Sequence, residues 1–313
     1  MREWAEPVWF AELPAEAGVF TRNQPLAPLT TIEVGGPAEV WAHVANWDGM
    51  AVLARWCNAN KVPLTLIGKG SNMMIRDGGI GGVVAHVAKG FDALVANGNT
   101  IYAEAGAACG TVARAAREAE LEGMAFFGGI PGSVGGALRM NAGAYGFETY
   151  ARMKQLWVID AAGETRQVAP DFVKPRYRGT ELPEGWIYKA AQWELPSGNK
   201  EEIRAQMQEI NRARSTSQPL HLPSSGSWFK NVERNGERVN AWKIVDEAGC
   251  RMMRVGGAMV SEQHANFFVN IGKTEGQSAT AAEFEALSQQ VEAQVKERLG
   301  IVMEREVRFT GVE

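Results

Sequence analysis

Residues 127–137 read Phe-Gly-Gly-Ile-Pro-Gly-Ser-Val-Gly-Gly-Ala, and this stretch decides how the chain is interpreted. It packs five glycines and one proline into eleven residues and carries no charge. Backbone without side chains can approach a ligand closely, and the neighbouring Phe126, Phe127 and Met140 are apolar. The stretch therefore suits a flat aromatic ligand that lies against bare backbone. The alternative interpretation is a buried crossover that binds nothing.

A second glycine loop, Gly68-Lys-Gly-Ser-Asn-Met, follows an apolar run at residues 62–67 that is typical of a short buried strand. A strand ending in such a loop presents backbone N–H groups to an anion, and the side chains of Ser71 and Asn72 add donors. The loop is not a Rossmann fingerprint, since Met73 stands where a third glycine is needed, and it is not a P-loop. A tight surface turn explains this loop alone equally well, but two such loops in one domain favour a dinucleotide ligand.

Composition and charge exclude several classes of protein. A chain of 313 residues is long enough for two or three domains, and a net charge of -4 gives no basic field for nucleic acid. Four histidines without metal-ligand spacing make a metal site unexpected. We expect a cytoplasmic location, because there is no leader-like start, no apolar run near the ~20 residues of a membrane span and no disulfide framework. The three cysteines are scattered, at Cys57, Cys109 and Cys250.

The hydrophobic pattern predicts both helices and strands. A helix at 48–60 feeds the strand at 62–67, and the clearest helix starts at a capping box of Thr280 and Glu283 and stops at Gly300. Further elements are predicted at residues 100–105 (strand), 111–121 (helix), 156–160 with 165–168 (hairpin), 200–214 (helix) and 301–309 (strand).

Several motifs follow one another in a fixed order. They are Leu29-Thr-Thr-Ile-Glu-Val-Gly-Gly-Pro-Ala, Ile67-Gly-Lys-Gly-Ser-Asn, Gly129-Ile-Pro-Gly-Ser-Val-Gly-Gly-Ala with Met140-Asn-Ala-Gly-Ala-Tyr-Gly, Tyr177-Arg178, Gln218-Pro219, Ser225-Gly-Ser-Trp-Phe-Lys-Asn, Gly257-Ala-Met-Val-Ser with His264-Ala-Asn-Phe, and Glu304-Arg-Glu-Val-Arg. Each motif alone is weak. Together, from about Leu26 to Gly311, they resemble the UDP-N-acetylenolpyruvoylglucosamine reductases of bacterial peptidoglycan precursor synthesis.

The resemblance implies an α+β fold with a vanillyl-alcohol-oxidase-type FAD-binding domain of two subdomains and a C-terminal α+β substrate-binding domain. We place the FAD-binding domain at residues 1–205, with subdomains at about 1–90 and 91–205, and the substrate-binding domain at 206–313. The implied activity is reduction of UDP-N-acetylglucosamine enolpyruvate to UDP-N-acetylmuramate by a monomer. Electrons come from NADPH through FAD, and the resemblance implies that NADPH uses the substrate cleft. The sequence itself contains no separate Rossmann motif that would place NADPH.

The same resemblance assigns the binding residues. The FAD pyrophosphate is expected at Gly68, Gly70, Ser71 and Asn72, and the isoalloxazine ring at Ile130, Pro131, Gly132, Ser133, Gly135, Gly136 and Ala137. The substrate is expected at Tyr145, Arg214, Gln218, Lys230 and Asn231. Where the family usually has proline after Phe-Lys-Asn, this chain has Val232, so we expect a more mobile loop there.

Three residues match the family's catalytic groups. Arg178 is expected to stabilise charge on the enolpyruvyl carboxylate, and Ser227 to donate a proton to C2. Glu306 is expected to set the charge and proton balance around them; whether Glu304, on the same strand face, assists is open. Composition alone favours a surface ion pair, a turn serine and an exposed strand carboxylate. Two other functions stay possible from the sequence: an FAD oxidase of the same superfamily, and a flavin-binding protein without turnover.

Overall fold

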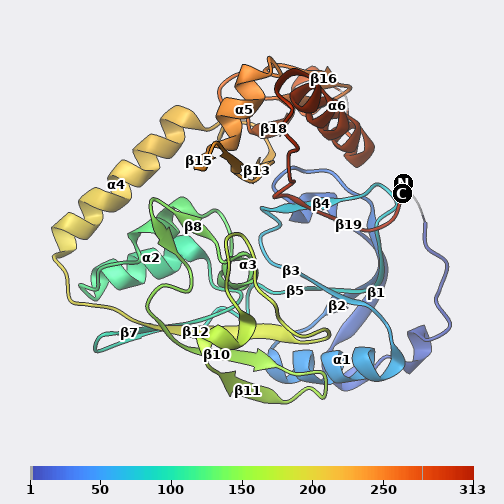
Figure 1. Ribbon diagram of the computed structural model, residues 1–313. Helices are drawn as coiled ribbons and strands as arrows, with labels where there is room; N and C mark the ends of the chain where they lie inside the picture. The colour runs from blue at the N-terminus through green and yellow to red at the C-terminus, as the bar shows by residue number, and fades with distance from the viewer. Residues whose placement is uncertain (1–2, 277) are drawn as a thin grey trace.

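The first part of the chain folds around a mixed four-stranded sheet in the computed structural model, which describes residues 3–276 and 278–313 (Figure 1). The strand order is β1 (Val19–Pro25), β2 (Pro37–His43), β5 (Ile80–His86) and β3 (Leu64–Ile67). β1 runs antiparallel to β2, and β5 runs parallel to β2 and β3. Helix α1 (Trp47–Asn60) packs Met50 and Leu53 against Val40 and Val83, and the side chain of Asn46 accepts a hydrogen bond from its first turn.

An antiparallel sheet of five strands forms the second part. Its order is β11 (Thr165–Val168), β10 (Met153–Ile159), β12 (Ile187–Glu194), β7 (Thr100–Glu104) and β6 (Leu94–Asn97). Helices α2 (Cys109–Glu118) and α3 (Val134–Met140) share its core, which surrounds the fully buried Trp193. A small hairpin of β8 (Gly143–Ala144) and β9 (Phe147–Glu148) lies beside them.

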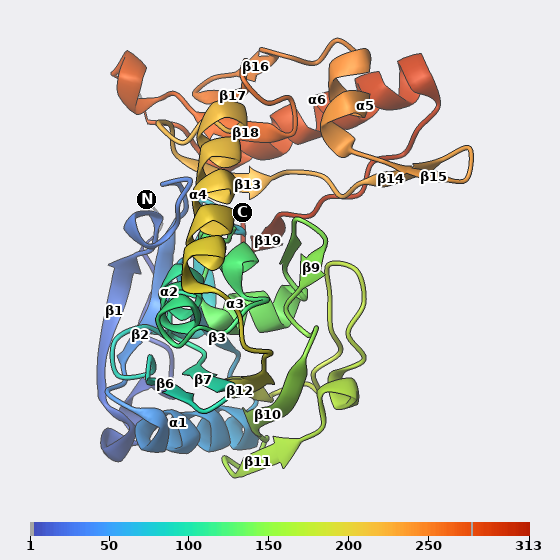
Figure 2. The same cartoon turned by 90° about the vertical axis from the view of Figure 1, so that its left-hand side faces the viewer.

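A third part, built mostly from residues after 217, sits above the other two (Figures 1 and 2). Its sheet has the order β13 (Ser224–Ser227), β18 (Phe267–Asn270), β17 (Ala258–Val260) and β16 (Arg254–Val255), accompanied by α5 (Ala241–Glu247), α6 (Ala281–Leu299) and a hairpin of β14 (Val232–Arg234) and β15 (Glu237–Val239). Trp228 stacks on Phe268 at 4.2 Å between ring centroids, in a core that also includes Ile32 and Met74 from the first part of the chain.

The long helix α4 (Lys200–Ser217) connects the second part to the third. Its buried residues Ile203, Met207 and Ile210 belong to the core of the second part. The helix is continuous through residue 205, so the domain division placed there stays a prediction. Short 3₁₀ turns occur at Phe10–Glu12, Ala15–Ala17, Ala27–Leu29, Ala125–Gly129, Pro170–Val173 and Lys273–Glu275.

Most of the expected elements are present, and two need correction. The helix expected at 111–121 spans Cys109–Glu118 and has no side-chain cap. The strand expected at 301–309 is reduced to β19 (Arg308–Thr310). The backbone of this segment bonds partners in two parts of the molecule. Glu306 N donates to Trp228 O at 2.8 Å in the third part, whereas Arg308 N donates to Asn72 O at 3.1 Å in the first. A segment shared by two parts of the molecule cannot form one continuous ladder.

The predicted capping box on α6 is confirmed, and a second cap reaches it from the first part of the chain. Asp77 accepts hydrogen bonds from Ala281 N and Ala282 N, both at 2.9 Å. One residue earlier, Arg76 makes two hydrogen bonds of 3.1 Å to Glu285. We call Arg76, Asp77 and Glu285 the α6 clasp. Within the described residues, no helix combines the length and the apolar character needed to cross a membrane.

We expect Asp77→Ala to lower the free energy of unfolding by about 1–2 kcal/mol, because two N-terminal amides of α6 lose their acceptor. Urea unfolding measures this change. Asp48→Ala is the matched control, since Asp48 lies exposed in the first turn of α1. An equal loss in both variants would contradict a role for the clasp.

Candidate active site

The two glycine loops identified in the sequence lie against each other. A Cβ atom on Gly68 would lie 2.3 Å from Oγ of Ser133, closer than side-chain packing permits. A Cβ atom on Gly132 would lie 3.4 Å from Oγ of Ser71. The absence of a side chain at Gly68 therefore lets the two loops approach each other closely, whereas the contact at Gly132 would be an ordinary one.

The first loop is held from its inner side. Gly70 has φ +59°, and a Cβ atom there would lie 2.1 Å from Leu29 O, so only glycine fits without strain. Thr31 N donates to Gly70 O at 3.3 Å, and His86 Nε2 lies 3.1 Å from Gly68 O. Both contacts use carbonyl oxygens, so they fix the loop without engaging its N–H groups.

The second loop leads into α3. Val134 N and Gly135 N donate to Ala107 O and Ala105 O, both at 2.8 Å, and a Cβ atom on Gly135 would lie 3.0 Å from Ala105 Cβ. Gly135 therefore allows α3 to approach the end of β7, and its amide is engaged within the protein. Among the other residues assigned to the isoalloxazine ring, Pro131 and Gly136 are exposed, Ile130 is half-buried and Ala137 lies in the core.

Asn72 ties the first loop to the end of the chain. Its side chain donates to Glu306 O at 3.3 Å, and its carbonyl accepts from Arg308 N at 3.1 Å. β19 continues from there in parallel with β4 (Met73–Ile75). The residues that follow the loop therefore determine where Glu306 lies.

Glu306 forms an ion pair with Arg178, as the predicted catalytic roles require. Arg178 Nε lies 2.9 Å from Glu306 Oε1, although the Nε–H is not directed at an acceptor, so the contact is electrostatic. Arg178 Nη1 donates to Gly143 O at 3.0 Å. Burial raises the pKa of Glu306 above its ordinary value; the positive charges of Arg178 and Lys230 oppose this rise without cancelling it.

Ser227 lies at the end of β13, next to Glu306. Ser227 pairs with Phe267 of β18, and the carbonyl of the following residue, Trp228, accepts from Glu306 N at 2.8 Å. Ser224 O accepts from the hydroxyl of Thr31 at 2.6 Å, which anchors β13 beside the first loop. The three predicted catalytic residues thus gather around one short segment at 304–308.

Three predicted substrate residues lie around Gly129. A Cβ atom there would lie 3.3 Å from the ring of Tyr145 and 3.6 Å from the side chain of Arg214. Tyr145 OH donates to Ile210 O at 3.3 Å, and Arg214 Nε donates to Gln218 Oε1 at 3.2 Å. The end of α4 with Gln218 after it, and the turn between β8 and β9, therefore bring a cation, an amide and a phenol to the edge of the second loop.

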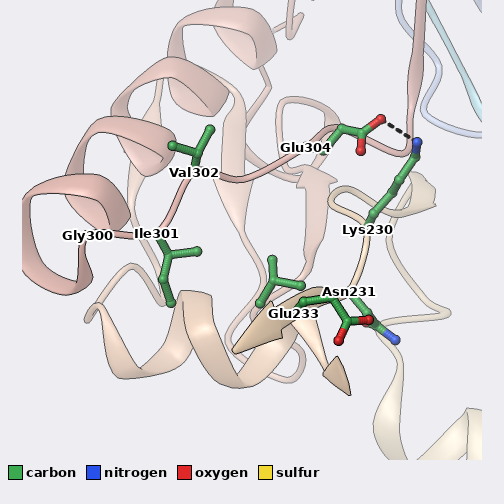
Figure 3. Close-up of a pocket in the computed structure, with 8 residues that line it drawn as sticks. Lys230, Asn231, Glu233, Gly300, Ile301, Val302 and Glu304 are labelled. Carbon is green, nitrogen blue, oxygen red and sulfur yellow. Dashed lines mark hydrogen bonds and ion pairs between the residues drawn. The ribbon is translucent and has the colours of Figure 1, made fainter. Parts of the chain in front are cut away.

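The other two substrate residues border a hollow of about 400 Å³ between α6 and the β14–β15 hairpin (Figure 3). Lys230 points toward Glu304 and forms an ion pair with it. Asn231 is engaged within the third part, since its Oδ1 accepts from Ala241 N at 3.0 Å and its amide donates to Asn240 at 3.2 Å. These bonds hold the start of α5, so Asn231 supports this wall of the site.

Sequence reasoning missed the residues that hold Trp228 and Phe229, which follow Ser227. The side chain of Asn266 accepts from Phe229 N and donates to Phe229 O, both at 2.9 Å, and the indole of Trp228 donates to Ser288 at 2.8 Å. Asn266 lies within the quoted motif His264-Ala-Asn-Phe, which pointed to it. The pairing of Trp228 with Ser288 of α6 carried no signal in the sequence.

Comparison with known proteins agrees with this geometry. An FAD-binding domain model matches residues 38–169, and a model of the UDP-N-acetylenolpyruvoylglucosamine reductase C-terminal domain matches residues 218–310. Reductases of that name from Azorhizobium caulinodans and Parvibaculum lavamentivorans are 40% and 41% identical to this chain over 98% and 96% of its length, and the matches span 96% and 94% of theirs. The chain belongs to the UDP-N-acetylenolpyruvoylglucosamine reductase family.

A solved reductase of this family supports the predicted fold. The Thermus caldophilus UDP-N-acetylenolpyruvylglucosamine reductase superimposes with a TM-score of 0.77 at 30% identity, covering 94% of this chain and 98% of that one. The α+β fold is therefore confirmed, with a vanillyl-alcohol-oxidase-type FAD-binding domain and a C-terminal domain. Membership of this reductase family also excludes the alternative that the chain is an FAD oxidase.

The cofactor is FAD, and the residues present fit it. The backbone cradle at Gly68 and Gly132 offers the close approach that a pyrophosphate and a flat ring need. The hydroxyl of Ser225 is buried and has no hydrogen-bond partner among the described residues. The next residue, Gly226, borders the first loop, since a Cβ atom there would lie 3.9 Å from Ser71 O. The assignment of each loop residue to a part of FAD stays a prediction.

We expect Gly68→Ala to weaken FAD binding by about tenfold or more, since its methyl group would overlap Ser133. FAD fluorescence titration of the stripped protein measures the dissociation constant. Gly110→Ala, in α2 with open space around its Cβ position, is the control and should bind FAD as wild type does. Wild-type affinity in Gly68→Ala would contradict the cradle.

We expect Glu306→Gln to change how stability depends on pH. The folded protein holds the Glu306 proton more tightly than the unfolded chain, whose glutamate pKa is about 4.3. Wild type therefore loses stability relative to the glutamine variant as pH rises from about 4 through the raised pKa, and the difference is constant above it. Urea unfolding across this range measures the difference. Glu304→Gln controls for loss of an exposed charge, and a pH-independent difference for Glu306→Gln would contradict the raised pKa.

Proposed function

We propose that the chain reduces UDP-N-acetylglucosamine enolpyruvate to UDP-N-acetylmuramate with electrons from NADPH, using Arg178, Ser227 and Glu306 at the reacting carbons. The observation that supports the proposal is that the segment at 304–308 brings together the ion pair of Glu306 with Arg178, the backbone of Trp228, which follows Ser227, and Asn72 of the first glycine loop. Family membership supplies the substrate class and the reductant.

Reduction of the enolpyruvyl double bond needs a hydride at C3 and a proton at C2. When bound, FAD supplies the hydride to C3 after taking it from NADPH. Negative charge then develops toward the substrate carboxylate, and Arg178 can meet it, because a guanidinium stays charged and can bind a carboxylate through two parallel hydrogen bonds. Its Nη1 is already fixed by Gly143 O, so little reorganisation is required.

In this proposal Ser227 protonates C2. A serine hydroxyl is a weak acid, so it must lie beside the enolate and receive a proton in return. Glu306 N bonds the carbonyl of Trp228, the residue after Ser227, and the raised pKa of Glu306 brings its carboxyl closer to the range in which it can exchange a proton. Paired with Arg178, it also limits the net positive charge of the site before substrate binds.

The two groups of polar side chains fit the rest of the substrate. Arg214 and Lys230 are cations suited to a diphosphate, and Tyr145 and Gln218 offer hydrogen bonds to sugar or phosphate oxygens. Burial lowers the pKa of Arg214, so an anionic ligand would relieve an uncompensated buried charge there. Lys230 would exchange Glu304 for that ligand.

An anaerobic visible spectrum tests the function. The flavin band of the loaded protein should bleach with NADPH and return when UDP-N-acetylglucosamine enolpyruvate is added. Return only with oxygen, or no bleaching, would contradict the proposal.

The cytoplasmic location and the monomeric state are further parts of the proposal. Cell fractionation tests the location, and sedimentation equilibrium tests the monomeric state.

Ser227→Ala should leave flavin reduction by NADPH intact and slow flavin reoxidation by the sugar nucleotide about 10²–10⁴-fold, the usual contribution of a positioned acid. Anaerobic stopped-flow absorbance resolves the two half-reactions. Ser224→Ala, three residues earlier on β13, is the matched control and should reoxidise at the wild-type rate. Equal damage to both half-reactions in Ser227→Ala would remove the role of Ser227 as proton donor.

A further inference from the structure

The first and third parts of the molecule are joined by the α6 clasp, and a second contact joins the β14–β15 hairpin to the second part. The hairpin projects from the third part on the side of β9 (Figure 2). Its turn residues Asn235 and Gly236 have φ +55° and +81°, the tight Asn-Gly turn that matches strand twist. A hairpin with this turn holds its side chains in a defined register.

Arg238 of β15 reaches across to Tyr177. Its guanidinium carbon lies 4.4 Å from the centroid of the Tyr177 ring, within the range of a cation–π contact. Glu233, its cross-strand partner in the hairpin, lies 3.3 Å from Arg238 Nε. Glu233 therefore directs the guanidinium while leaving its face for the ring.

Tyr177 and Arg178 form the tip of a tight turn. Arg176 and Gly179 exchange backbone hydrogen bonds of 2.9 Å and 3.2 Å across its base. Arg178 has φ +57°, a left-handed conformation that is costly for a residue with a side chain. A strained tip of this kind keeps its shape only when neighbouring contacts hold it.

We propose that the contact between Arg238 and Tyr177, which we call the latch, joins the third part to the second and holds Arg178 beside Glu306. Arg238 is then a positioning residue for the reduction step, and this role rests on the proposed function. The latch connects the third part, which supplies Ser227, to the turn that supplies Arg178. The two catalytic groups come from different parts of the molecule, so their distance depends on such a contact.

Within the described residues, the second arginine of the hairpin, Arg234, does not contact the second part as Arg238 does. Arg234 makes hydrogen bonds of 2.7 Å and 3.2 Å to Glu247 and so stays within the third part. Both side chains are partly exposed and carry the same charge. Arg234 is therefore a matched control for Arg238.

The test compares Arg238→Met with Arg234→Met. Arg238→Met should slow reoxidation of reduced flavin by the sugar nucleotide about two- to fivefold, the effect expected from losing a half-exposed cation–ring contact, while Arg234→Met stays at the wild-type rate. Tyr177→Leu should slow the reaction at least as much as Arg238→Met, because the guanidinium of Arg178 also lies 5.2 Å from this ring. Tyr177→Phe, which keeps the ring face, should restore the rate. The double variant Arg238→Met/Tyr177→Leu should be no slower than Tyr177→Leu.

Equal slowing by Arg234→Met, or effects of Arg238→Met and Tyr177→Leu that multiply, would overturn the latch. A second readout does not depend on activity: the losses in urea midpoint caused by the two substitutions should be less than additive. Failure of wild type to reoxidise with the sugar nucleotide would instead overturn the proposed function, and the midpoints would still judge the contact.

Discussion

The parallel pairing of β19 with β4 is the constraint on which the site depends. β4 begins directly after the first glycine loop, and Asn72 bonds both Glu306 O and Arg308 N. A strand that ends the chain is thereby fixed against the loop that starts the cofactor cradle, although more than 230 residues separate them. The same segment pairs with Trp228 and Lys230, which places Ser227 beside it. One short stretch thus aligns the first glycine loop with Glu306 and with the segment that contains Ser227.

This arrangement makes the interface between the parts of the molecule a component of the proposed mechanism. The α6 clasp fixes one side of the interface through charged, partly buried hydrogen bonds, which are stronger than neutral ones. Arg305 adds a second cation to the clasp, with Nη1 3.6 Å from Glu285. The opposite side is held by the weaker contact of Arg238 with Tyr177. Because the α6 clasp is stronger than the contact of Arg238 with Tyr177, the interface would open for a sugar nucleotide on the Arg238 side. Glu306 would then stay beside the first glycine loop.

Much of this account could be predicted from the sequence, since the ordered motifs indicated the family, the fold and FAD, and supplied the three residues that we propose as catalytic. Local signals also gave the α6 capping box, because Thr280 and Glu283 act within one turn. What failed depends on distant partners. The strand expected at 301–309 shortened because its residues divide between Trp228 and Asn72, and the cap from Asp77 on α6 has no local signature. Motif order likewise says nothing of Asn231 supporting α5.

Hydrogen exchange on FAD binding tests the central claim most directly. If the first glycine loop and the segment at 304–308 form one unit, FAD binding to the stripped protein should slow exchange at the amides of Glu306 and Arg308 as well as in residues 68–72. Protection confined to the two glycine loops, with unchanged exchange at Glu306 and Arg308, would contradict the account.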